Sequence, residues 1–71
     1  MWWGVFVFPY RVYSLDRAGR LSVGEEIRAG DDQAAMALAR ELMPYVVKAE
    51  LWEGGRLVAT LDDQGWTTNP A

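Results

Sequence analysis

Few residues of this 71-residue chain could do chemistry, because it contains no histidine and no cysteine. Ser14 and Ser22 therefore lack the usual base of a nucleophilic site, and Lys48 is the only lysine. The acidic pairs at 25–26 and 31–32 have side chains suited to acid–base work or to a hard cation. Their spacing matches no calcium loop, and a polar strand end and a helix cap explain them more simply. We predict no catalytic, cofactor-binding or metal-binding residues and hence no enzyme.

Composition and charge restrict the class of protein further. The chain is 51% hydrophobic, which is typical of a folded domain, and its length allows only one. Its net charge is −3 and its basic residues are dispersed, so no basic stripe for nucleic acid is expected. A domain this small usually needs a disulfide, a metal or a partner subunit. Without cysteine or histidine, association with a second copy is the remaining means of stabilisation.

The chain opens with an apolar arm, residues 1–9. Phe6 and Phe8 alternate with Val5 and Val7, which is the period of a strand. The arm lacks the basic start and cleavage site of a signal peptide, and it is too short to span a bilayer. We therefore expect a cytoplasmic protein with no membrane span. Pro9 has no N–H, so the arm is expected to bend away or to follow a sheet edge.

Residues 10–27 predict the first hairpin. Strand-forming residues lie on both sides of an expected turn at 16–19, where Gly19 can adopt positive φ. With this turn, Val12 pairs with Val23 and Tyr10 pairs with Glu25. The core face of the hairpin would then consist of Tyr10, Val12, Leu21, Val23 and Ile27.

A helix follows in "AGDDQAAMALARELMPY". Asp31 or Asp32 would cap its start, and Pro44 would end it near Leu42 or Met43. The stripe predicted to face the sheet has helical spacing and consists of Ala35, Leu38, Ala39 and Leu42.

A second hairpin is predicted in "VVKAELWEGGRLVATL". Gly54 and Gly55 suit a type I′ turn, which pairs Glu53 with Arg56, Trp52 with Leu57 and Leu51 with Val58. The fold class is therefore α+β: a single two-layer ββαββ domain over residues 10–61, with a four-stranded antiparallel sheet of order 2-1-3-4 and one helix on one face. Residues 62–71 are expected to form a flexible tail anchored only by Trp66.

The sheet face opposite the helix is the strongest functional signal. It should carry large apolar groups, which are typical of a contact surface: Tyr13, Leu15, Trp52 and Leu57. The apolar arm, with Trp2, Trp3 and Phe6, needs a similar surface. We predict a non-enzymatic module that forms a homodimer through this face and the arm. The open alternatives are that the arm covers the face of its own chain, or that the face binds a ligand or another protein.

The stretch from Tyr10 to Leu61 resembles a group of small bacterial proteins, mainly alphaproteobacterial. The pieces that carry the resemblance are "YRVYSLDRAGRL", "DDQAAMALARELM" and "AELWEGGRLVATL". The resemblance implies the ββαββ fold and no particular reaction, so it assigns no functional residues. Members of this group tend to begin near the position of Pro9, which makes residues 1–8 resemble an added extension.

Overall fold

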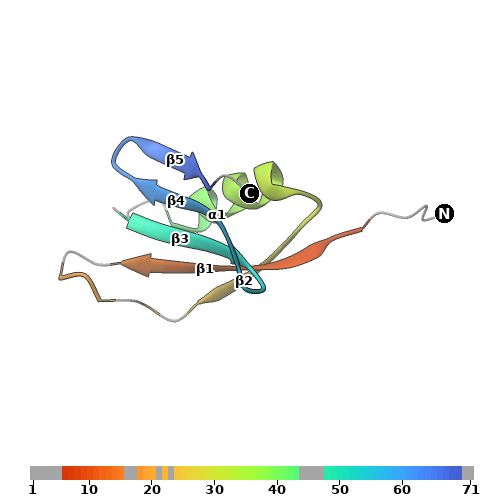
Figure 1. The fold of residues 1–71 in the computed structure, drawn as a ribbon, viewed down its shortest axis with the longest axis horizontal. Coiled ribbons are helices and arrows are strands. Elements are labelled where there is room, and N and C mark those ends of the chain that lie inside the picture. Colours follow the sequence, from red (N-terminus) through yellow and green to blue (C-terminus); the bar gives the residue numbers. More distant parts are fainter. Residues whose placement is uncertain (1–5, 16–17, 21, 23, 44–47, 70–71) are drawn as a thin grey trace.

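The computed structural model describes residues 6–15, 18–20, 22, 24–43 and 48–69. Trp2, Trp3, Leu21 and Val23 lie outside these ranges, as do Asp16 and Arg17 of the turn expected at 16–19. The elements in chain order are β1 (Phe8–Leu15), β2 (Glu25–Ala29), α1 (Asp32–Leu42), β3 (Lys48–Glu53), β4 (Arg56–Asp62) and β5 (Gly65–Thr68). In Figure 1 the helix lies on one side of the sheet, so the α+β class with one helix and an antiparallel sheet is confirmed.

The sheet has five strands in the order β2-β1-β3-β4-β5, and every neighbouring pair is antiparallel. The predicted order of the first four strands is confirmed, but the prediction of only four strands is wrong. The segment expected to be a flexible tail contributes β5. Gly65 has φ 105°, which permits the tight turn, and Trp66 then pairs with Leu61 and packs against the buried cluster.

The first hairpin is correctly placed, but its predicted register is wrong by two residues. Val12 pairs with Glu25 and Tyr10 with Ile27. A shift of two residues keeps every side chain on its face, so Tyr10, Val12 and Ile27 are buried as expected and Ala29 joins them. This register needs a glycine at position 24, just before β2, because a Cβ there would lie 2.6 Å from the ring of Tyr13.

The second hairpin has the predicted position, and two of its three predicted pairs are confirmed. Glu53 pairs with Arg56 and Trp52 with Leu57, but Leu51 pairs with Ala59 across a β-bulge. The extra residue lets Val58 and Ala59 both be buried. Only the first turn glycine, Gly54, has positive φ, at 58°, so the type I′ turn, which needs two such residues, is not formed.

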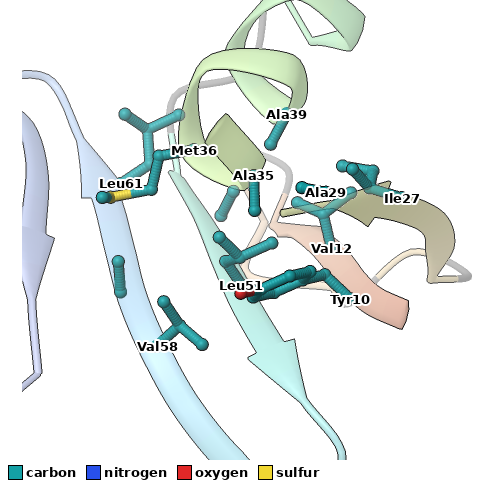
Figure 2. Close-up of a cluster of buried hydrophobic side chains, with 12 residues drawn as sticks. Tyr10, Val12, Ile27, Ala29, Ala35, Met36, Ala39, Leu51, Val58 and Leu61 are labelled. Carbon is teal, nitrogen blue, oxygen red and sulfur yellow. The ribbon is translucent and has the colours of Figure 1, made fainter. Parts of the chain in front are cut away.

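The helix has its predicted cap but not its predicted buried stripe. Asp31 is the cap, and its Oδ1 accepts a hydrogen bond from the Ala34 N–H at 2.8 Å. Ala35 and Ala39 are fully buried, whereas Leu38 is 40% exposed and Leu42 is 54% exposed. Met36 is buried in their place, beside Leu61 (Figure 2). The helix is rolled toward its alanines because they allow a close approach to the sheet, and the flexible Met36 fills the space at its flank.

Pro9 lies within β1 without breaking a ladder hydrogen bond. The Ser22 N–H donates to the Ser14 carbonyl at 2.8 Å, so the backbone groups of Ser14 point toward the β2 side. By strand alternation, the nitrogen of Pro9 points the other way, toward the β3 side. There β3 pairs with β1 only from Arg11 onward. The strand therefore continues to Phe8 with a single neighbour, which is the sheet-edge alternative expected for proline.

Substitutions on the helix test its observed rotation. Met36→Ala should lower the free energy of unfolding by about 2–5 kcal/mol, because it leaves a cavity in the core. Leu38→Ala, on the exposed flank, should cost less than about 1 kcal/mol. Urea denaturation of both variants measures the difference. A larger loss for Leu38→Ala than for Met36→Ala would contradict the placement of the helix.

Candidate functional site

The sheet surface opposite α1, here called the open face, brings together the aromatic and aliphatic residues predicted for it. Cross-strand pairing places Trp52 beside Leu57 on β4 and beside Arg11 on β1. Tyr13 pairs with Glu50 and is therefore the diagonal neighbour of Trp52. Leu15 lies on the same face at the end of β1, opposite Lys48. All four predicted residues of the sheet, Tyr13, Leu15, Trp52 and Leu57, are half-buried.

The arm residue Phe6 does not join this surface within its own chain. It precedes the first residue of β1 and is 74% exposed. The strand from Phe8 to Tyr13 alone spans about 17 Å, whereas the two-residue step from Phe6 to Phe8 reaches only about 7 Å, so Phe6 cannot fold back to Tyr13. The structure thus separates Phe6 from the predicted sheet residues.

Polar side chains surround Tyr13 and Trp52. The Trp52 Nε1–H donates to Glu50 Oε1 at 3.1 Å, which fixes the indole on the face. The Arg28 Nε donates to Glu26 Oε2 at 3.1 Å, and the Arg11 Nη2 lies 3.8 Å from Glu26 Oε1. A shallow depression runs between these groups. It is lined by Pro9, Arg11, Tyr13, Glu26, Glu50, Trp52 and Gly54.

The charges of the open face balance. Among the described residues of the strands, register and alternation place three cations there, Arg11, Arg28 and Lys48. The same reasoning places three anions there, Glu26, Glu50 and Asp62. The face is therefore neutral although the whole chain carries −3. A neutral face lets two chains of like net charge approach each other at that surface.

A second polar cluster lies at the start of the helix, and the sequence interpretation missed it. The Tyr10 hydroxyl donates to Asp32 Oδ1 at 2.8 Å, and Arg56 holds both oxygens of Asp32, with contacts at 3.0 and 3.2 Å. Arg56 also binds Glu53 Oε1 at 2.5 Å. Because Asp31 alone caps the helix, Asp32 is available to join β1 and β4 to α1. The signal in the sequence was the second aspartate, which a single cap does not need.

The protonation behaviour of this cluster follows from its hydrogen bonds. The Arg56 guanidinium, with help from the Tyr10 hydroxyl, holds the pKa of Asp32 below its ordinary value. Burial, together with the hydrogen bond to Asp32, raises the pKa of Tyr10 to about 12. A carboxylate with a lowered pKa is a weaker base, so the arrangement suits a structural clamp better than proton transfer.

The other candidates for chemistry are accounted for by their neighbours. The hydroxyls of Ser14 and Ser22 lie 2.5 Å apart and bond to each other. In the part of the chain that the structure describes, no three acidic side chains converge as metal ligands. None of the described helical residues form a segment long and apolar enough to cross a membrane.

Comparison with known proteins gives no relative from which a role could be transferred, since no family model, curated protein or solved structure matches the chain. The open face and the polar cluster around Asp32 are therefore the features that bear on function.

The raised pKa of Tyr10 predicts how stability depends on alkaline pH. Tyr10 ionises near pH 10 in the unfolded chain but near 12 in the folded one, so its contribution is complete below pH 10. That contribution should be lost as the pH rises from 10 to 12. Parent and Tyr10→Phe should therefore converge in free energy of unfolding over this interval, because the variant has no phenol to ionise. Denaturation at several pH values measures both; a constant difference would contradict the assignment.

Proposed function

We propose that this protein is a non-enzymatic interaction module that forms a homodimer through its open face. The observation that carries the proposal is that Tyr13, Trp52 and Leu57 lie together on the side of the sheet away from α1. Aromatic residues flanked by arginine are the types most enriched at the energetic centres of protein interfaces. Stacking two such faces would cover the side of each sheet that the one described helix leaves open.

The arm adds a second source of apolar surface to the proposed interface. Phe6, Val7 and Phe8 are consecutive, and all three are among the exposed large hydrophobic residues. Since Phe6 cannot reach Tyr13 of its own chain, we propose that it packs against a second copy, which would remove it from water. By strand alternation Phe8 lies on the helix side of the sheet, near Tyr10, so the partner chain would have to cover the arm beyond the edge of the two stacked open faces.

The alternative function is that of a binding domain that remains a single chain. The depression between Tyr13 and Trp52 supports this alternative, because concave sites with convergent polar groups accept ligands or peptide segments. The two functions differ in oligomeric state, so one experiment separates them.

Trp52→Glu tests the proposal. In a homodimer the substitution places an unpaired charge in a desolvated contact, so the variant should weaken association by at least about 100-fold. Light scattering gives the mass of parent and variant, and far-UV circular dichroism shows whether the variant folds.

Leu38→Glu is the matched control, since it introduces the same charge on the exposed flank of α1. It should keep the mass of the parent. A parent that scatters as one chain at all concentrations would contradict dimerisation and favour the alternative. Equal weakening by both variants would show that the dimer does not use the open face.

A further inference from the structure

We infer that the two open faces meet about a two-fold axis that places Arg11 of each chain on an aromatic ring of the other. This inference rests on the proposed function and specifies its geometry. It follows from four side chains at the centre of the face, here called the central block: Arg11, Tyr13, Glu50 and Trp52.

The central block has two rows and two columns. Arg11 pairs with Trp52 in one row, and Tyr13 pairs with Glu50 in the next. Arg11 and Tyr13 form the column on β1, whereas Trp52 and Glu50 form the column on β3. The block therefore holds one cation, one anion and two aromatic rings, and directly paired side chains in it lie about 5 Å apart.

Two-fold symmetry restricts what can meet what. When two identical faces stack with their strands aligned, which avoids the crossed arrangement that sets Arg11 against the partner's Arg11, the axis lies in the plane between them and exchanges positions on either side of it. An axis along the strands, between the columns, puts Arg11 on the partner's Trp52 and Tyr13 on the partner's Glu50. An axis across the strands, between the rows, puts Arg11 on the partner's Tyr13 and Trp52 on the partner's Glu50.

Both orientations give the same contact chemistry. Each Arg11 meets a ring of the partner, which is a favourable cation–π arrangement once water is excluded. Each Glu50 meets the other ring of the partner: Tyr13, whose hydroxyl is a hydrogen-bond donor, or Trp52, whose N–H donates to Glu50 of its own chain. In neither orientation do two like charges of the central block face each other. A second copy is therefore the partner that this pattern fits.

The contacts that Arg11 makes in its own chain leave it available for this role. Its only described ion pair is with Glu26 at 3.8 Å, and Glu26 is also held by Arg28 at the shorter distance of 3.1 Å. A guanidinium has five N–H donors and a flat surface, so one long contact uses little of its capacity.

Charge reversal at two arginines of the same face provides the test. Arg11→Glu should weaken the dimer by about 100-fold or more, because both copies lose the contact and gain an anion against a ring and near Glu50. Arg28→Glu makes the same charge change on the edge strand β2, outside the central block, and should alter the dissociation constant by less than about 5-fold. Arg11→Lys keeps a cation and should retain more association than Arg11→Gln.

Sedimentation velocity over a dilution series measures each dissociation constant, with circular dichroism as the check on folding. Equal effects of Arg11→Glu and Arg28→Glu, in a chain that Trp52→Glu still dissociates, would overturn the central-block geometry and leave the proposed function standing. If Trp52→Glu also leaves the dimer intact, the open face is not the interface and both proposals fail. If Arg11→Glu does not fold, Arg11→Gln takes its place. Arg11→Gln should still weaken the dimer more than Arg11→Lys does, and equal dissociation constants for the two would contradict the central-block geometry.

Discussion

The structure depends on how closely its one described helix can approach the sheet. Ala35 and Ala39 are both fully buried, so the backbone of α1 lies near Leu51 at the sheet centre (Figure 2). This helix of eleven residues lies on one face of the five-stranded sheet, and no other helix in the part of the chain that the structure describes covers the opposite face. The buried cluster is consequently one-sided, and the half-buried Tyr13 and Trp52 lie on the opposite surface. The dimer that we propose would correct this imbalance, because it would cover the face that the helix leaves open.

Two adjacent aspartates fix the helix against the sheet through different contacts. Asp31 satisfies the Ala34 N–H at the first turn, whereas Asp32 receives the Tyr10 hydroxyl from β1 and the Arg56 guanidinium from β4. The buried ring of Tyr10 thus contributes to the core while its hydroxyl joins the clamp. The clamp ties strands on both sides of β3 to the start of the helix. It thereby restrains the orientation of α1, which lies on the side of the sheet opposite the open face.

Local patterns predicted the first four strands and the helix, whereas long-range packing determined the strand registers and the rotation of the helix. The position of the turn at Gly54 and Gly55, though not its type, and a cap at Asp31 or Asp32 follow from residues close in sequence. The order of the first four strands follows from a helix that carries the chain across the first strand. The register of β1 with β2 depends instead on the fit of Gly24 beneath Tyr13, and the bulge at Val58 depends on burying two adjacent residues. Helical spacing alone could not choose between Leu38 and Met36 at the flank of the alanine stripe. The strand at 65–68 had too few apolar residues for a periodic signal, since Trp66 alone packs inward.

The same distinction applies to the candidate site. Strand alternation was enough to group Tyr13, Leu15, Trp52 and Leu57 on one face, because a two-residue error in register does not change the face. It could not show the Asp32 clamp, whose members come from four separate elements or their ends. The most direct test of the central claim is sedimentation equilibrium of the unaltered chain over a wide concentration range. The account predicts the mass of two chains at high concentration and reversible dissociation on dilution. The mass of one chain at every concentration would contradict it.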